Sequence, residues 1–344
     1  MTKLFFYVSG EHKTLPYAEI KAILEAEGFL YENVETFPKL LCLKSDIRCV
    51  PSISRRAGFL KVCGVEIFRC RAEEKEIIYR AKAESYDEYI MNGQTFSVRV
   101  KKSQVSSVID VRKLEREIGR TILERAKDVK VRLNSPDKAF LGVLSGGLLI
   151  FGLELAEASS KDLFRRKPRR RPFFHPSAMS PKLARCMVNL ARTKPNSLVL
   201  DPFCGTGSIL LETGLIGCGI LGSDINPKMV RGSLQNLKHF KIHPSNFLVA
   251  DAKNLPFRQV DCIVTDPPYG RASSTFGGNI RTIVAEFLHS AVNTLKECGH
   301  ICISLPSSVK IREVCEGLGY KIVEEHSIRE HKSLTREITI LKFE

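Results

Sequence analysis

The run Asp-Pro-Pro-Tyr at residues 266–269 carries the residue types needed to activate an amine on a planar ring. Such an amine is a poor nucleophile, because its lone pair is delocalised into the ring. Two acceptors on its N–H groups, the Asp266 carboxylate and the Pro267 carbonyl, would pyramidalise the nitrogen, and consecutive prolines hold that carbonyl rigidly. Tyr269 would stack on a base flipped into the site. Asp266 is also placed to take the proton late as a general base.

A glycine-rich loop at residues 201–207 decides whether that run is a functional motif or an ordinary turn. The loop, Asp-Pro-Phe-Cys-Gly-Thr-Gly, lies between an apolar strand and a helix, an order typical of ligand binding at a strand's carboxyl end. Gly205 and Gly207 let the backbone approach a ligand and adopt positive φ. The loop has neither the Gly-x-Gly-x-x-Gly fingerprint of dinucleotide-binding proteins nor the Gly-Lys-Ser/Thr ending of phosphate-binding loops. Asp201 is expected beside a cationic amino acid moiety, with a helix-capping turn as the alternative.

Acidic residues end the next two expected strands as well. Asp224 has the spacing of a carboxylate that binds ribose hydroxyls, and Asp251 would accept from an adenine amino group. Either Asp alone is a common helix cap, but three in register, followed by the amine motif, predict S-adenosylmethionine and methyl transfer. The residues expected to contact this cofactor are Asp201, Phe203, Cys204, Gly205, Thr206, Gly207, Asp224, Ile225, Asp251, Ala252 and Asp266. We interpret Cys204 as a residue that packs within the loop and not as a nucleophile, because no nearby His would stabilise its thiolate.

These motifs need a sheet that brings the strand ends together, and residues 174–344 show its pattern. Helical segments separate the expected strands, which lie at 198–200, 219–222, 246–249, 262–265, 300–305, 321–323 and 338–343. This alternation predicts a Rossmann-like, doubly wound, mostly parallel α/β sheet.

The N-terminal half is expected to form two smaller α/β units, at residues 1–54 and 55–157. The first has strands at 4–8 and 40–43 around a helix that ends at Gly28. In the second, the helix expected at 110–123 turns its apolar residues to one side and its cations largely to the other. Further strands are expected at 65–70, 96–100 and 130–133, with a hairpin joining 140–143 to 148–155.

Positive charge is concentrated in the N-terminal half of a chain whose net charge is +15. Residues 158–173 have no apolar period and are expected to be a linker, within which residues 161–171 are strongly basic. Concentrated positive charge indicates a polyanionic partner, although a well-solvated surface is the simpler alternative. The side chains expected to contact RNA phosphates are Arg99, Lys101, Lys102, Arg112, Lys113, Arg116, Arg165, Arg166, Arg169, Arg170 and Arg171.

Several other classes are disfavoured by composition. No apolar run is long enough to span a membrane, and the apolar N-terminus is too short for a signal peptide. The eleven cysteines include no Cys-x-x-Cys pair, so we expect no metal site and no disulfide framework. Buried thiols in a reducing compartment fit best, which predicts a cytoplasmic protein.

Residues 201–207 and 266–270 together resemble the class I amino-methyltransferases. The run at 171–185 resembles the segment that closes over the methionine moiety in that group, which implies cofactor contacts for His175 and Pro176. Residues 96–155 resemble a THUMP domain, a module of RNA-modifying enzymes, and residues 1–54 resemble the ferredoxin-like unit that precedes it.

With the run at 331–338, nearly the whole chain is similar to the archaeal tRNA (guanine-10-N2)-methyltransferase family. That resemblance implies one or two methyl groups on the N2 amine of a tRNA guanosine, with the THUMP domain holding the acceptor end. Some members of the family work with a small zinc-binding activator protein.

Three alternatives remain open at this point. One is methylation of another RNA guanine at N2, and a second is methylation of adenine N6 or cytosine N4 in DNA, with which the Asp-Pro-Pro-Tyr motif is compatible. A third is a non-enzymatic RNA-binding protein, which the intact set of acidic strand ends disfavours.

Overall fold

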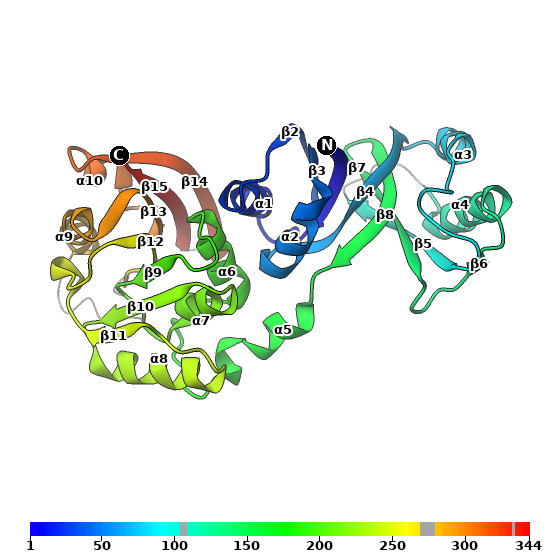
Figure 1. The fold of residues 1–344 in the computed structure, drawn as a ribbon. Helices are drawn as coiled ribbons and strands as arrows, with labels where there is room; N and C mark the ends of the chain where they lie inside the picture. The colour runs from blue at the N-terminus through cyan, green and yellow to red at the C-terminus, as the bar shows by residue number, and fades with distance from the viewer. Residues whose placement is uncertain (104–108, 269–278, 332–333) are drawn as a thin grey trace. The chain divides into compact units, whose positions relative to one another are not determined.

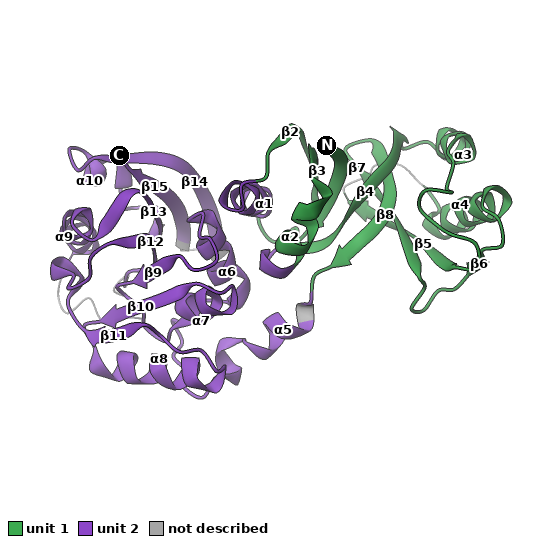
Figure 2. Cartoon of the chain, viewed as in Figure 1, with its two compact units in different colours: residues 1–13, 29–54, 60–158 green, residues 14–28, 55–59, 159–344 purple. Residues whose placement is uncertain are grey.

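The computed structural model describes residues 1–103, 109–268, 279–331 and 334–344 (Figure 1). The chain divides into two compact units (Figure 2). Unit 1 comprises residues 1–13, 29–54 and 60–158, and unit 2 comprises residues 14–28, 55–59 and 159–344. Among the described residues, no helix has the length and apolarity required to cross a bilayer.

Unit 1 is built on one eight-stranded sheet with the order β2-β3-β1-β4-β8-β7-β5-β6. The sheet runs through both of the segments expected as separate units, since β1 pairs with β4 and β4 with β8. The expected hairpin is confirmed, because β7 and β8 pair antiparallel. The strands are β1 (Thr2–Val8), β2 (Tyr31–Phe37), β3 (Leu40–Ser45), β4 (Leu60–Arg71), β5 (Thr95–Ser103), β6 (Lys130–Val131), β7 (Lys138–Ser145) and β8 (Leu148–Glu157).

Helices α3 (Glu74–Ala83) and α4 (Val111–Arg125) pack together, and both contribute to the core of unit 1. α4 begins after Asp110, whose carboxylate accepts from the backbone N–H of Arg112 at 3.0 Å. Leu114, Ile118 and Ile122 are buried beneath it, as its sequence period predicts. Its cationic side chains are therefore left on the outer side. Helix α2 (Val50–Arg56) and the 3-10 helix η1 (Ile47–Cys49) precede β4.

Unit 2 contains a seven-stranded sheet with the order β11-β10-β9-β12-β13-β15-β14. The strands from β11 to β13 are parallel, and β15 runs antiparallel to both β13 and β14. The Rossmann-like α/β prediction is therefore confirmed. The strands are β9 (Leu198–Asp201), β10 (Gly219–Asp224), β11 (Asn246–Val249), β12 (Val260–Thr265), β13 (Leu295–Pro306), β14 (Tyr320–His331) and β15 (Leu334–Phe343).

Helices accompany this sheet in the alternating order expected. They are α6 (Pro181–Leu190), α7 (Ser208–Leu215), α8 (Pro227–His239), α9 (Ile280–Val292), α10 (Ile311–Cys315) and the 3-10 helix η3 (Ala252–Asn254). The expected linker is partly helical instead of irregular, with α5 (Ser160–Arg165) and the 3-10 helix η2 (Pro168–Arg170).

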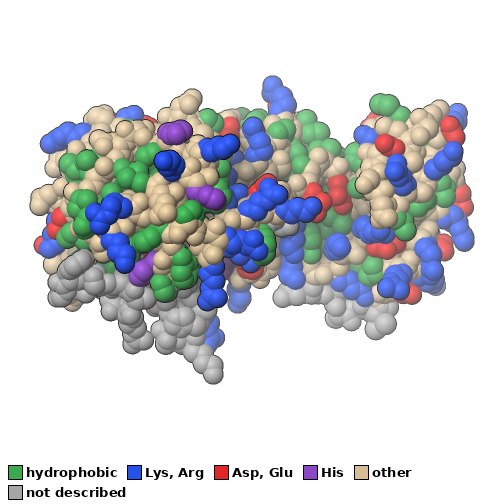
Figure 3. Space-filling model, turned by 90° about the horizontal axis from the view of Figure 1, so that it is seen from below, with side chains coloured by type: hydrophobic (Ala, Val, Ile, Leu, Met, Phe, Trp, Pro, Cys, Tyr) green, Lys and Arg blue, Asp and Glu red, His purple; other side chains and the backbone are tan. Residues whose placement is uncertain are grey.

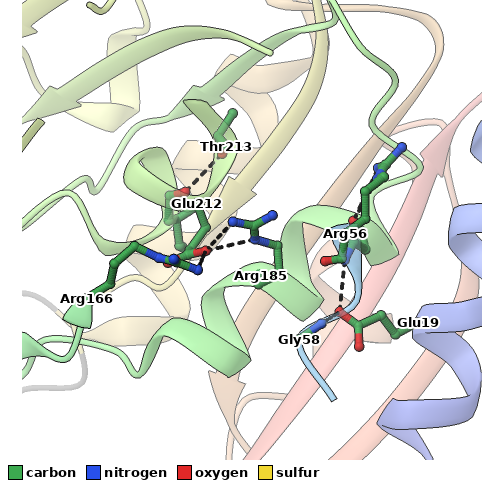
Figure 4. A network of polar contacts seen from close by, with 9 residues as sticks. Glu19, Arg56, Gly58, Arg166, Arg185, Glu212 and Thr213 are labelled. Atoms are coloured by element: carbon green, nitrogen blue, oxygen red, sulfur yellow. Dashed lines mark hydrogen bonds and ion pairs between the residues drawn. The ribbon is translucent and has the colours of Figure 1, made fainter. Parts of the chain in front are cut away.

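Helix α1 (Leu15–Ala26) and residues 55–59 belong to unit 2, although they lie in the N-terminal part of the sequence. Leu15 and Phe59 share a buried cluster with residues of α6 and β15. Buried Glu19 accepts from the backbone N–H groups of Gly58 and Phe59 and from the Asn189 amide, at 2.8–3.0 Å (Figure 4). The core of unit 2 thus extends beyond the residues 174–344 expected for a catalytic domain.

Candidate active site

The carboxyl ends of four parallel strands form the candidate site. From β9 the chain moves outward through β10 and β11, then returns to the other side of β9 as β12, so the order of the strands reverses there. Ligands of open α/β sheets bind at such a switch point. Asp201 ends β9 and Asp224 ends β10, while Asp251 and Asp266 follow β11 and β12. The sheet therefore places on one edge the four carboxylates that the sequence analysis selected.

The loop after β9 has the backbone shape expected of a ligand cradle. Gly205 and Gly207 have φ values of 50° and 76°. A Cβ atom on Gly207 would lie 2.3 Å from the Ser233 hydroxyl, so the loop packs too closely on α8 for a larger residue. Cys204 is buried, and burial raises its pKa well above the usual value, so it is a neutral packed thiol. Thr206 is also buried.

Asp201 is a carboxyl group whose burial favours the neutral form. It is 1% exposed, and its Oδ1 accepts from the Thr265 hydroxyl at 2.7 Å and from the Phe203 N–H at 3.2 Å. Burial raises the pKa of Asp201 to about 8, against the lowering effect of those two bonds. A bound cation would relieve this desolvation, because opposite charge favours the ionised form. The Thr265 bond also ties β9 to the end of β12.

Asp224 and Asp251 hold the neighbouring loops. Asp224 accepts from the N–H groups of Gly205 and Asn226, both at 2.9 Å, while burial raises its pKa. Asp251 caps η3 by accepting from Lys253 N–H at 3.1 Å. The side chain next to Asp224, Ile225, is 48% exposed and offers apolar surface at this edge.

Carboxylates, a glycine cradle and exposed apolar surface fit the parts of S-adenosylmethionine, which carries a cationic amino acid, a ribose and a planar base. Ala252, the first residue of η3, is buried. His175 is half-buried with its Nδ1 2.7 Å from the Ser177 hydroxyl, and Pro176 is exposed. Both lie in the segment between η2 and α6.

Asp266 is held by a residue that the sequence analysis did not select. Arg336, on β15, donates from Nη1 to Asp266 Oδ2 at 2.7 Å, and both side chains are largely buried. The two are 70 positions apart, and β15 reaches the site through its antiparallel pairing with β13. The only signal in the sequence was that residue 336 lies in the 331–338 run, which family resemblance had marked. Pro267 is buried, and Tyr269 lies outside the described residues.

Six of the expected RNA-contacting residues lie on β5 and α4 of unit 1, two elements that pack against each other. Arg99 is half-buried, while Lys101, Lys102, Arg112, Lys113 and Arg116 are exposed. Lys113 forms an ion pair with Glu74 at 2.6 Å, and Lys102 donates to the carbonyl of Ile109. Successive residues of β5 point to opposite faces of the sheet, so Arg99 and Lys101 lie on the face opposite α4, while Lys102 lies on the face that α4 covers.

The expectation for the linker arginines needs a correction. Arg165, Arg169 and Arg170 are exposed, but Arg171 is buried and the side chain of Arg166 is only 11% exposed. Arg166 binds both carboxylate oxygens of Glu212 at 2.8 and 3.1 Å (Figure 4). Arg171 donates to the Ser208 hydroxyl at 2.6 Å, and burial lowers its pKa to about 10. Fully buried Glu212 requires a cationic partner, which Arg166 supplies, and Arg171 is bound to Ser208, so both arginines are engaged within unit 2.

Comparison with protein families gives two matches. Residues 168–337 match the family described as RMKL-like, methyltransferase domain. Residues 5–235 match a family described as DNA methylase, a range that includes the cofactor loop but ends before Asp266.

Individual relatives match over almost the whole chain. A tRNA (guanine(10)-N2)-dimethyltransferase of Methanothermobacter thermautotrophicus is 35% identical over 99% of both chains. That of Methanocaldococcus jannaschii is 32% identical over 98% of this chain and 99% of its own. Among solved structures, TrmN from Thermus thermophilus matches 99% of this chain and all of its own with a TM-score of 0.58 at 18% identity, which shows a shared fold. SMU.472 in complex with SAH also has a TM-score of 0.58, at 14% identity, with 100% of this chain and 99% of its own covered.

Proposed function

The chain belongs to the archaeal tRNA (guanine(10)-N2)-dimethyltransferase family, and we propose that it methylates the N2 amine of guanosine 10 in tRNA. The observation that carries this proposal is the set of four carboxylates on one sheet edge, with Asp266 beside the switch point. Full-length similarity to tRNA enzymes favours RNA over DNA as the substrate.

The cofactor site is assigned to the edge from β11 to β9. S-adenosylmethionine supplies a methyl group on a positively charged sulfonium. Asp201 balances the cationic amino acid moiety, Asp224 binds the ribose hydroxyls, and Asp251 accepts from the adenine amino group. Gly205 and Gly207 allow the backbone to approach, since both already have positive φ. His175 and Pro176 cover the methionine moiety.

The target amine is aligned by Asp266 and Pro267. The carboxylate and the carbonyl each accept one N–H of guanine N2, which turns the nitrogen lone pair out of the ring plane. Arg336 fixes one carboxylate oxygen and so reduces the orientations available to Asp266. We assign base stacking to Tyr269. Asp266 then acts chiefly as an aligning acceptor, and secondarily as the proton acceptor.

RNA recognition is assigned first to unit 1. Its cations bind tRNA phosphates on two sides of the sheet: Arg99 and Lys101 on one face, and Lys102 with Arg112, Lys113 and Arg116 on the side of α4. We place the enzyme with its tRNA in the cytoplasm. A small zinc-binding activator is a partner suggested only by resemblance, and methylation by the purified chain alone would exclude a requirement for it.

The deciding experiment compares the wild-type protein with Asp266→Ala on labelled cofactor and unmodified tRNA. We expect the variant to lose turnover while the Kd for tRNA stays unchanged, because Asp266 acts on the amine and not on the RNA backbone. Nucleosides from digested tRNA are mapped by mass spectrometry, and duplex DNA serves as the competing substrate. Undiminished methylation by the variant, or methylation of DNA alone, would contradict the proposal.

A further inference from the structure

Residues 160–171, which we call the linker segment, have two chemically different sides. The segment contains α5 and η2 and belongs to unit 2, at the point where the chain leaves unit 1. The inner side carries the buried arginines, Arg166 and Arg171. The exposed side chains of the outer side are Lys161, Phe164, Arg165, Lys167, Arg169 and Arg170, together with the segment's single acidic residue, Asp162.

The inner side fixes the segment next to the cofactor loop. Glu212 of α7 is fully buried and binds Arg166 from the linker segment and Arg185 from α6, the latter at 2.7 Å (Figure 4). Arg171 donates to the Ser208 hydroxyl, which lies 3.2 Å from the hydroxyl of Thr206 in that loop. The outer side is therefore held at a defined place on the catalytic unit.

The outer side combines an exposed aromatic ring with cations. Phe164 is 46% exposed, and the Arg170 guanidinium lies 4.1 Å from its ring centroid. The Lys167 ammonium lies 4.8 Å from the same centroid. Leaving a phenyl ring in water is unfavourable, and an aromatic surrounded by cations is the arrangement that binds unpaired nucleotides, with the ring on a base and the cations on phosphates. Figure 3 shows a face on which Lys and Arg side chains are more widespread than acidic ones.

We infer that the outer side of the linker segment is a second RNA-contacting surface, on which Phe164 stacks against an unpaired tRNA base and Arg169 and Arg170 bind phosphates. This inference rests on the proposed function, because tRNA is its occupant. Because the cations outnumber the single Asp162, this surface favours a polyanion as its ligand. The exposed ring favours a nucleic acid whose bases are unpaired and accessible. Arg171 on the inner side binds Ser208, whose hydroxyl lies beside that of Thr206. RNA bound on the outer side is therefore held at a fixed position relative to the cofactor loop.

The first test separates stacking from general packing at Phe164. Phe164→Leu keeps apolar volume but removes the ring, and we expect its Kd for tRNA to rise about fivefold or more while the salt dependence stays unchanged. Phe164→Tyr keeps the ring and should bind tRNA as the wild type does. Equal affinities for the Leu variant and the wild type would overturn the stacking role.

The second test uses variants matched in charge. Arg169→Gln/Arg170→Gln and Lys194→Gln/Lys321→Gln each remove two exposed cations from unit 2. Lys194 lies in the turn before β9 and Lys321 is the second residue of β14. We expect the slope of log Kd against log salt concentration to fall by about one to two for the first variant only. An unchanged slope, or an equal fall in both variants, would overturn the surface assignment.

Wild-type activity separates a failure of the linker-segment surface from a failure of the proposed function. If the wild type methylates tRNA but the linker variants bind it normally, the second surface is wrong and the proposed function stands. If the wild type neither binds nor methylates tRNA, the proposed function fails, and with it the assignment of tRNA to this surface. Cofactor binding measured for every variant confirms that unit 2 is folded.

Discussion

The bond between Arg336 and Asp266 gives the catalytic carboxylate a fixed orientation. We expect Arg336→Met to lower the single-turnover methylation rate about 10²-fold, because small misplacements of an aligning group have effects of that size. Arg336→Lys should recover part of the rate, since it restores a charge without the planar fork. The Kd values for tRNA and cofactor should be unchanged in both variants. A Met variant with the wild-type rate constant would contradict the positioning role.

The buried carboxyl of Asp201 predicts a pH dependence of cofactor binding. Its pKa of about 8 means that it is mostly protonated at neutral pH in the free protein. Binding of the cationic cofactor favours the carboxylate, so the Kd should rise by up to tenfold per pH unit below 8 and protons should be released on binding. Calorimetry in buffers of different ionisation enthalpy measures that release, and Asp201→Asn should abolish it.

The same pKa shift has a defined sign for stability. The folded-state pKa of about 8 lies above the unfolded value of roughly 3.9, so folding favours the protonated carboxyl. This contribution is complete at low pH and is lost as the pH rises towards 8. The free energy of unfolding of Asp201→Asn should therefore depend less on pH across this window than that of the wild type.

At the residue scale, local sequence was enough to select groups that end strands. Asp201, Asp224 and Asp251 follow apolar runs, so their place on one edge follows from parallel pairing. Arg336 was not predictable in the same way, because its proximity to Asp266 depends on the antiparallel placement of β15. The ion pair of Arg166 with Glu212 could not be predicted either, because a run of basic residues does not indicate which of its side chains face the protein interior.

At the element scale, Glu212 on α7 fastens the linker segment and α6 to the helix that follows the cofactor loop. We expect Glu212→Ala to lower the free energy of unfolding by about 3–5 kcal/mol, because it leaves two buried arginines without this carboxylate. Glu212→Gln keeps acceptor capacity and should cost less. Urea unfolding measures both. Glu286→Ala is the matched control, because it breaks an exposed pair with Lys253 that contributes about 1 kcal/mol or less.

Element periodicity predicted strands and amphipathic helices better than it predicted connections. The strands of unit 2 and helix α4 occur where apolar spacing placed them. β2 was missed because its residues are mostly exposed and show no apolar alternation. α5 was missed because a six-residue helix dominated by charged residues carries too few apolar positions to define a period.

At the scale of the whole molecule, the chain order does not match the compact units. The loss of an apolar period at residue 158 predicted a boundary between the N-terminal units and the catalytic domain. Residues 14–28 and 55–59 nevertheless pack within unit 2. Sequence patterns report which side of a helix is apolar but not which core it joins. For α1, that core is the cluster of α6 and β15, and buried Arg56 donates there to Asn189 and Thr193.

This arrangement predicts that the C-terminal part is not an autonomous domain. A fragment of residues 159–344 lacks α1 and residues 55–59, so it exposes the apolar surface that Leu15 and Phe59 cover and removes Arg56 from buried Asn189. We expect it to lose its cooperative thermal transition and its affinity for S-adenosylmethionine. Co-expression with residues 1–158 should restore both, because that fragment supplies the missing segments. If the 159–344 fragment alone had the Tm and cofactor Kd of the full chain, α1 would be dispensable. The C-terminal part would then be an independently folding domain that begins at the linker.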